Sequence, residues 1–348
     1  MKAKNSAVAL FATASLALTA ACGGGGGGET AVPVVTSGNL DELVAAAKKE
    51  GSLTYYSSIA QDQIDVLTQA FTKKYGIKVE VLRLNSGELV QRYSAEAQGG
   101  SVRADALEYA SPEVFNGEPQ WFTALNENEI PALADWPDNA KQPRSLVTSL
   151  FPYSVTYNTD LVPKPPTTWS QLAGSEWKGR ISLVDPRTSP SYIGWADAVE
   201  KEFGPEYLSK LGALQPELAQ SATPGAQQVA AGAFAVNFPS MPVHPLPLKA
   251  SGAPVDYQII SDPPIKLAIN MGISAQAPHP NAARLFASWR LTQEGQVAAC
   301  SKGSVSSPIS LNNEIEGCLP LESDWRLIEY GLGDARTNEL LDLLGISG

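Results

Sequence analysis

Hydroxyl side chains gather in loops beside predicted strands and helix starts, where they are placed to bind a small anion. In an open parallel sheet, ligands bind beyond the carboxyl ends of the strands, where helix N-termini present free N–H groups and partial positive charge. Hydroxyl and backbone N–H groups suit the oxygens of a carboxylate or phosphonate. The residues are Ser57 and Ser58, Ser86 and Gly87, Thr188, Ser189 and Ser191, and Ser221 and Thr223.

Arg187 stands in one of these loops and supplies the positive charge that an anion requires. Its guanidinium can bind two ligand oxygens through parallel hydrogen bonds. A structural interpretation stays open beside the functional one. Each serine can be an ordinary helix N-cap worth about 1 kcal/mol, and Arg187 can belong to a surface or hinge ion pair.

Aromatic and amide side chains complete the predicted ligand site. Tyr109 and Tyr153 lie near strand ends, where a flat ring can form the floor under an organic ligand, and Tyr157 and Tyr192 have similar positions. Packing in the core is the alternative, and it fits Tyr157 best. Asn237 ends a predicted strand and joins the candidate set.

The motifs of common hydrolases are absent from the sequence. Neither a G-x-S-x-G elbow nor an H-E-x-x-H motif occurs. His244 and His279 are the only histidines, and both precede proline in predicted loops. The sequence therefore disfavours a Ser-His-Asp triad. Asp185 and Glu108 are single candidates and not a visible acid–base pair. We therefore expect no enzyme, with an extracytoplasmic hydrolase as the rival hypothesis.

The charge balance argues against nucleic acid as a partner. The chain has a formal net charge of −11. Removal of residues 1–21 would delete two lysines and no acids, which gives −13. Such a surface repels phosphate backbones.

The candidate site requires elements that bring these loops together. From Asn39 onward, helical and strand periods alternate. Asn39 is predicted to cap a helix over 40–50, with Glu42 in the capping-box position and Gly51 at the end. Strands are predicted at 52–56, 77–82 and 104–109, with one helix between each strand and the next. Ser86 is predicted to cap the helix between the second and third of these strands. One helix between successive strands favours a parallel sheet covered on both faces.

A second α/β unit follows the proline-rich break at 163–166. A strand at 154–158 is predicted before this break, and strands at 180–185, 234–238 and 255–260 with helices at 191–203, 206–214 and 226–231 are predicted after it. An apolar stretch over 266–273 can cross back into the first domain, before a helix that starts at Pro280.

The N-terminus is typical of a bacterial lipoprotein signal peptide. Lys2 and Lys4 precede an apolar run that ends in small residues before Cys22. The run is too short for a spanning helix, and Thr19 departs from the leucine that is commonest three residues before the cysteine. We expect cleavage after residue 21, a diacylated Cys22, and a Gly-rich tether over 22–36. The protein would then be lipid-anchored outside the cytoplasm, at the cell surface or on the periplasmic face.

The remaining cysteines, Cys300 and Cys318, form a pair in a compartment that permits disulfides. A bridge between them would contribute about 3 kcal/mol. Two buried free thiols are the alternative. A redox pair is disfavoured, because no C-x-x-C spacing exists.

Several motifs in order along the chain resemble the substrate-binding lipoproteins of bacterial ABC importers, in the branch that contains the ferric-ion binding proteins. They are LVAAAKKEG (43–51) with YYSS (55–58), FTKKYGIKV (71–79), NSGEL (85–89), WKGR (177–180), DPR (185–187), and HPNAA (279–283) with QEGQ (293–296). The resemblance covers essentially the whole mature body. It implies a periplasmic-binding-protein-like fold with two α/β lobes, each a mostly parallel sheet flanked by helices, and two hinge strands.

The resemblance also implies a function, which is capture of a small-molecule ligand by hinge closure and its delivery to ABC permease subunits in the membrane. In the ferric binders an adjacent tyrosine pair that ligates iron follows the strand equivalent to 234–238. Here no such pair follows Asn237, and no set of metal ligands converges. We therefore expect a small anionic organic ligand, a carboxylate, phosphonate or sugar phosphate, with iron or an iron chelate as the alternative.

The expected lobe boundaries follow from the same pattern. Lobe 1 comprises 37–152 and 262–300, lobe 2 comprises 153–261, and 301–348 is a C-terminal helical segment that packs across the lobes. We expect a monomer that binds neither a cofactor nor a resident metal.

Overall fold

The computed structural model describes residues 32–310, 314–321 and 324–346. The predicted signal peptide, the lipidation site Cys22 and residues 22–31 of the predicted tether lie outside these ranges. Among the described residues, no helix combines the length and the hydropathy needed to cross a bilayer.

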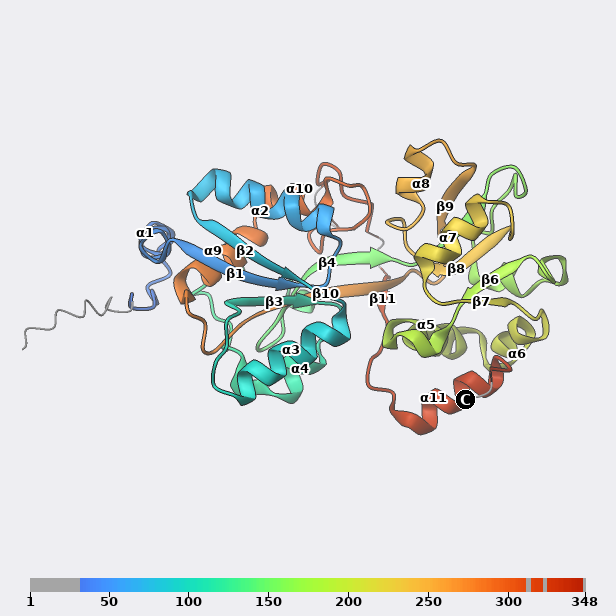
Figure 1. Ribbon diagram of the computed structural model, residues 1–348, viewed down its shortest axis with the longest axis horizontal. Helices are drawn as coiled ribbons and strands as arrows, with labels where there is room; N and C mark the ends of the chain where they lie inside the picture. Colours follow the sequence, from blue (N-terminus) through green and yellow to red (C-terminus); the bar gives the residue numbers. More distant parts are fainter. Residues whose placement is uncertain (1–31, 311–313, 322–323, 347–348) are drawn as a thin grey trace, which may run out of the picture. The chain divides into compact units, whose positions relative to one another are not determined.

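The first of two mixed sheets has the strand order β11-β10-β3-β1-β2, with β4 also paired to β10 (Figure 1). Strands β1, β2 and β3 run parallel, while β10 runs antiparallel to both β3 and β4. The strands are β1 (Ser52–Ser57), β2 (Lys78–Arg83), β3 (Ala106–Tyr109), β4 (Leu146–Pro152), β10 (Ile265–Ile273) and β11 (Arg326–Leu327).

The second sheet has the order β7-β6-β8-β5-β9. Strands β7, β6 and β8 are parallel, and β5 pairs antiparallel with β8 and β9. The strands are β5 (Ser154–Asn158), β6 (Ile181–Val184), β7 (Glu217–Ala219), β8 (Val236–Ser240) and β9 (Val255–Ile259).

Helices flank both sheets (Figure 1). With the first sheet belong α1 (Leu40–Glu50), α2 (Gln61–Tyr75), α3 (Ser86–Gln98), α4 (Glu113–Gly117), α9 (Pro280–Arg290) and α10 (Gln293–Cys300). With the second belong α5 (Pro190–Phe203), α6 (Pro205–Ala213), α7 (Ala222–Ala230), α8 (Leu246–Ala250) and α11 (Gly333–Leu343).

Two strand pairs carry the chain between the sheets. Strand β4 belongs to the first sheet, and β5 follows in the second after the single residue Tyr153. The chain returns between β9 and β10. The predicted α/β architecture of two lobes joined by two strands is confirmed. The sheets are mixed because β10 and β11 in the first sheet, and β5 in the second, run antiparallel to the other strands.

Local capping explains where the first helices begin. The side chain of Asn39 accepts hydrogen bonds from the N–H groups of Asp41 and Glu42, and Gly51 ends α1 in the left-handed conformation that glycine favours. Helix α3 differs from its prediction by one residue. Asn85 is its N-cap and forms a capping box with Glu88, whereas Ser86 is the first helical residue.

Aromatic clusters fill the core beside each sheet. Beside the first sheet, the Phe71 ring packs edge-on against Phe286 and also contacts Trp289. Beside the second sheet, Trp195 packs against Trp169 and Phe238. These large buried side chains supply much of the apolar area removed from water.

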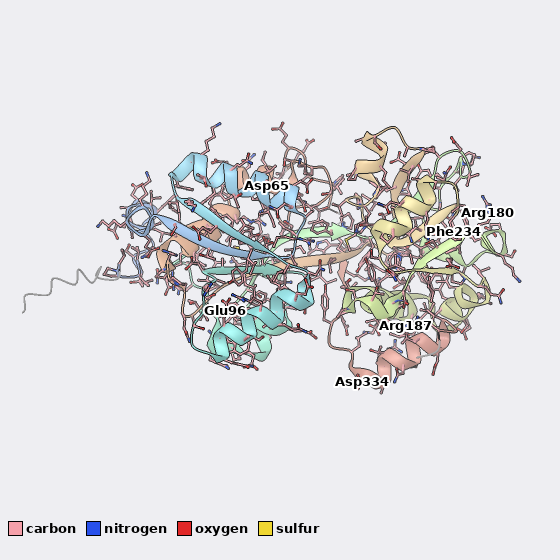
Figure 2. All side chains as sticks on the ribbon, in the orientation of Figure 1. Asp65, Glu96, Arg180, Arg187, Phe234 and Asp334 are labelled. Carbon is pink, nitrogen blue, oxygen red and sulfur yellow. A yellow bond between two sulfur atoms is a disulfide. The ribbon has the colours of Figure 1, made fainter. Side chains whose placement is uncertain are left out.

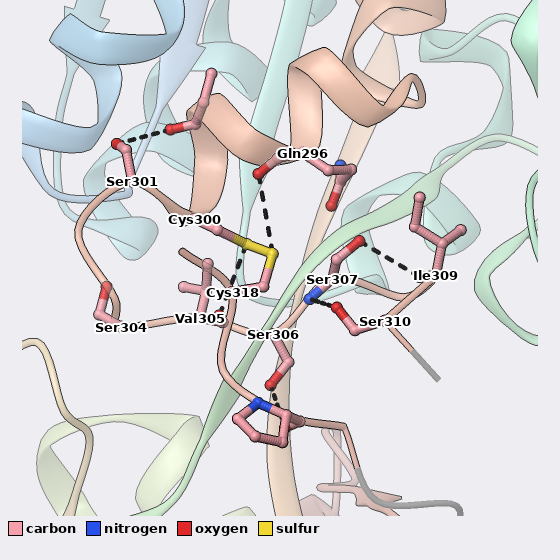
Figure 3. Close-up of a disulfide and its surroundings, with 12 residues drawn as sticks. Gln296, Cys300, Ser301, Ser304, Val305, Ser306, Ser307, Ile309, Ser310 and Cys318 are labelled. Atoms are coloured by element: carbon pink, nitrogen blue, oxygen red, sulfur yellow. Dashed lines mark hydrogen bonds between the residues drawn. A yellow bond between two sulfur atoms is a disulfide. The ribbon is translucent and has the colours of Figure 1, made fainter. Parts of the chain in front are cut away.

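Cys300 and Cys318 form a disulfide, with their Cα atoms 4.6 Å apart (Figure 3). The bridge closes a loop in which Ser306 pairs with Leu150 of β4, through N–H···O contacts of 2.8 and 2.9 Å. It therefore anchors a loop that lies against one of the strands connecting the sheets.

A fully buried ion pair joins β3 to α9. Arg290 Nη2 lies 2.7 Å from Glu108 Oε1, and side-chain exposure is 1% for Arg290 and 0% for Glu108. The hydroxyl of Thr148 on β4 donates to the same carboxylate oxygen. Glu108, a single acidic candidate in the sequence, thus lies in the core and not in an acid–base pair.

Candidate functional site

A cavity of about 1160 Å³ is lined by loops and helices from both sheets. Its walls include the turn between β1 and α2, one side of α3, the start of α4, the first turns of α5 and α7, and the segment after β8. Phe151 of β4 and Leu267 and Ile269 of β10 also line it, so the strands that connect the sheets form part of the cavity wall.

Four helices of nine or more residues, α2, α3, α5 and α7, present first-turn residues to this cavity. Ala60 precedes α2 and Ser221 precedes α7, and neither residue makes a side-chain capping bond. No N-cap side chain therefore satisfies the first N–H groups of these two helices, but in α7 the backbone of Ala222 hydrogen-bonds to the Tyr192 side chain. In α5 the Ser189 hydroxyl accepts from the N–H of Ser191. Uncapped helix starts favour a negatively charged group.

Six of the predicted ligand residues line the cavity. They are Ser58, Ser86, Gly87, Tyr109, Ser189 and Thr223. Ser191 and Tyr192, singled out in the sequence, also line it. Tyr109 is 3% exposed, and its hydroxyl accepts a hydrogen bond from the N–H of Val114 at 3.1 Å. These residues come from both sheets, as the strand-end argument requires.

Arg187 does not line the cavity, and it lies on the short turn before α5 (Figure 2). Its Nη2 and Nε lie 2.8 and 3.0 Å from the two carboxylate oxygens of Asp185. The guanidinium holds the pKa of Asp185 below its usual value, chiefly by this hydrogen bonding. The hydroxyl of Thr188 donates to the carbonyl of Asp185 at 2.7 Å. This geometry is an ion pair, which is the alternative interpretation of Arg187 from the sequence.

The other predicted residues bond to the protein itself and do not line the cavity. Ser57 is fully buried, and its hydroxyl accepts from the N–H of Ile59. The Tyr153 hydroxyl donates to the carbonyl of Ser191 at 2.7 Å. Asn237 donates through its amide to Ser182. Ser221 is the N-cap of α7.

The comparisons with known proteins agree with this arrangement. The sequence profile of the family described as "Bacterial extracellular solute-binding protein" matches residues 50–297, which is more than half of the chain. The chain belongs to this family. Its members are solute-binding proteins, which agrees with a cavity between two sheets and with an extracytoplasmic location.

Solved structures share the fold of this solute-binding protein at low sequence identity. An ABC transporter substrate-binding protein from Agrobacterium tumefaciens is 16% identical, with a TM-score of 0.69 over 84% of this chain and 95% of that one. Iron-bound HitA from Pseudomonas aeruginosa is 18% identical, with a TM-score of 0.63 over 85% and 97%. AfuA from Actinobacillus pleuropneumoniae, with fructose-6-phosphate bound, is 19% identical, with a TM-score of 0.61 over 85% and 97%. One fold thus serves chemically different ligands.

Sequence reasoning missed Arg83, Gln63 and His244, which all line the cavity. Arg83 is the last residue of β2, so the strand-end argument applied to charged residues would have found it. Gln63 is 4% exposed, and its Oε1 atom has no hydrogen-bond partner among the described residues. Its Nε2 donates to Ser304 at 3.2 Å.

His244 is a neutral hydrogen-bond donor at the cavity wall. Its Nδ1 accepts the backbone N–H of Met241 at 3.1 Å, so the ring proton resides on Nε2. Burial lowers the pKa of His244 to about 4, because desolvation disfavours the imidazolium form. Among the described residues, none takes a hydrogen bond from Nε2.

The depressed pKa of His244 predicts a loss of stability in mild acid. The unfolded chain takes up a proton near pH 6.5, whereas the folded ring resists protonation down to about pH 4. Acidification between these values therefore favours the unfolded state, by about 2 kcal/mol at pH 5. Urea unfolding at pH 7 and pH 5 measures this difference, which His244→Gln should largely remove. Equal pH dependence in both proteins would contradict the assignment.

A Ser-His-Asp arrangement does occur, contrary to the sequence expectation, but none of its members lines the cavity. His279 Nε2 lies 2.9 Å from Ser52 Oγ, and its Nδ1 lies 2.9 Å from Asp105 Oδ2. Asp105 is fully buried and also accepts from the N–H groups of Thr54 and His279, both at 2.6 Å. Ser52 begins β1, at the opposite strand end from Ser58. The network joins β1, the residue before β3 and the start of α9.

Metal ligands do not gather at the site. Within the described ranges, no three histidine, cysteine, aspartate or glutamate side chains lie close enough to hold a metal ion. Ferric iron is a hard cation that requires several such ligands or phenolates. The cavity instead carries apolar groups from Met241, Leu248 and Phe151, which suit the body of an organic molecule.

Proposed function

We propose that this protein captures a small organic anion and delivers it to the permease of an ABC importer. The observation that carries the proposal is the cavity lined by six predicted residues and by the N-terminal turns of four helices from both sheets. Arg83 adds a positive charge at this cavity. Such an arrangement stabilises a carboxylate or phosphonate through hydrogen bonds and helix dipoles.

The proposed mechanism is hinge closure about the two strand crossings. A ligand that contacts Ser58 and Ser86 on one side and Ser189 and Thr223 on the other binds fully only when both walls approach. Its differential affinity then shifts the population toward the closed state, which the permease would recognise. The proposed lobes are 37–152 with 262–300 and 153–261. We further propose a monomer, anchored to the outer face of the cell membrane through a lipid on Cys22.

Native mass spectrometry of the protein purified under mild conditions tests the function, because a retained adduct reports the ligand mass directly. Small-angle scattering at saturating ligand should show compaction. An assay of the same sample for ester and glycoside hydrolysis should show no turnover. A protein that retains no adduct, shows no ligand-dependent rise in melting temperature and hydrolyses a substrate would contradict the proposal.

Arg83→Gln is expected to weaken binding of the ligand found in this way by at least tenfold. Within the described ranges the guanidinium has only neutral hydrogen-bond partners, Ile59 O at 3.4 Å and Asn85 Oδ1 at 3.3 Å, so its charge is available to an anion. Arg187→Gln is the matched control, because the Asp185 carboxylate already pairs with Arg187. Isothermal titration calorimetry on both variants distinguishes them. A larger loss of affinity for Arg187→Gln than for Arg83→Gln would show that Arg187, and not Arg83, binds the anion.

A further inference from the structure

The charged groups around the cavity do not match a simple anion. Among the described lining residues, Arg83 is the only lysine or arginine, whereas Asp62, Glu113 and Glu118 are acidic. Lys302 lies 3.9 Å from Asp62 and offsets part of its charge. Glu113 and Glu118 have no ion pair with any residue in the described part of the chain. The cavity therefore exposes one uncompensated cation and two uncompensated carboxylates.

The two kinds of charge belong to different elements. Arg83 ends β2 and contacts the carbonyl of Ile59, so it lies beside the uncapped start of α2. Glu113 begins α4, and Glu118 directly follows its end. The anionic group of a ligand is therefore expected at the β2–α2 wall. A dianion such as a sugar phosphate would face a single arginine together with two carboxylates.

The wall near α4 has the composition of a site for an organic ammonium group. Tyr109, Trp121 and Tyr330 line the cavity beside Glu113 and Glu118. Aromatic faces and carboxylates together stabilise amine and quaternary ammonium cations. Tyr330 adds an aromatic ring to this wall, while its hydroxyl oxygen is shielded from solvent.

The remaining polar groups add no positive charge. His244 is neutral at physiological pH, because its ring is desolvated and Nδ1 accepts from the backbone. The amide of Gln63 is also neutral. His244 can donate to the ligand through Nε2 without changing the charge balance, whereas the Oε1 atom of Gln63 is shielded from solvent.

We infer that the ligand is a zwitterion, a small organic molecule that carries one acidic group and one basic or quaternary nitrogen. This inference rests on the proposed function and specifies its substrate class. The acidic group lies by Arg83 and the α2 start, and the nitrogen lies by Glu113, Glu118 and the aromatic side chains. The apolar wall from Phe151 and Leu267 accommodates the carbon skeleton.

Two measurements test the inference. The elemental composition of the native adduct should include a basic nitrogen and an acidic group. Calorimetry should then be performed with L-amino acids, betaine and γ-aminobutyrate, and with butyrate, succinate and fructose 6-phosphate as ligands that lack the nitrogen. We expect the best zwitterion to bind at least tenfold more tightly than any ligand of the second set.

Variants locate the nitrogen. Glu113→Gln with Glu118→Gln should weaken the best zwitterion at least tenfold and leave succinate binding unchanged or stronger. Glu217→Gln is the matched control, because Glu217 is exposed on β7 and does not line the cavity. An adduct without a basic nitrogen, or tightest binding of succinate or fructose 6-phosphate, overturns the inference and leaves the proposed function intact. If a zwitterion binds with unchanged affinity after both substitutions, the assignment of its nitrogen to Glu113 and Glu118 is wrong. Absence of any adduct and of any binding overturns the proposed function itself.

Discussion

Replacing Arg290 with methionine is expected to lower the free energy of unfolding by about 3 to 5 kcal/mol. Arg290 and Glu108 are both almost completely shielded from solvent and lie 2.7 Å apart. Removing the guanidinium leaves the Glu108 carboxylate in a low-dielectric core where, among the residues that the structure describes, only the hydroxyl of Thr148 remains as a hydrogen-bond partner. The cost arises from this unpaired charge more than from the lost attraction. Urea unfolding at pH 7 measures the effect.

Two further variants separate burial from pairing. Arg290→Met combined with Glu108→Gln removes both charges and should recover a substantial part of the lost stability. Lys78→Met breaks an ion pair whose side chains are 74% and 57% exposed, and should change stability by less than about 1 kcal/mol. A double variant as unstable as Arg290→Met alone would show that packing of the arginine stem, and not charge, controls this site.

The elements that position the site could be predicted because they depend on local chemistry. Asn39 and Gly51 fix the ends of α1 through a side-chain cap and a left-handed glycine. Strand periods and the helices between successive strands specify the parallel part of each sheet. The strand-end argument predicted that Ser58, Ser86 and Thr223 lie at one site, because parallel strands end at the same edge of a sheet. All three residues line the cavity.

The side chains that complete the site depend on direction and on distant partners. Ser57 and Ser58 are neighbours, but Ser57 is fully buried whereas Ser58 lines the cavity, since successive side chains near a strand end point apart. Arg187 turns back to Asp185, two residues earlier, which a loop conformation decides. His279 forms a hydrogen bond with Asp105, which lies 174 positions earlier in the sequence. No spacing rule in a single chain reports such contacts.

Replacing Cys300 and Cys318 together with alanine is expected to lower the free energy of unfolding by about 3 kcal/mol. The bond closes a loop of 18 residues by sequence separation, and the chain-entropy model assigns this cost to restriction of the unfolded chain. Wild-type protein unfolded in urea with excess dithiothreitol should match the double variant in oxidising buffer. Agreement would attribute the effect to the bond and not to the side chains. Equal stability of oxidised and reduced wild type would contradict the prediction.

Ligand affinity distinguishes where the disulfide acts. The loop that it closes contains Ser304, which accepts the hydrogen bond from Gln63 at the cavity wall, and Ser306, which pairs with β4. If the bond restricts only the unfolded chain, the alanine variant should keep wild-type affinity while losing stability. A parallel loss of affinity would mean that the folded loop depends on the bond to hold Gln63 in place. Both quantities can be measured on one preparation, so the unfolded-state and folded-state contributions of the disulfide can be separated.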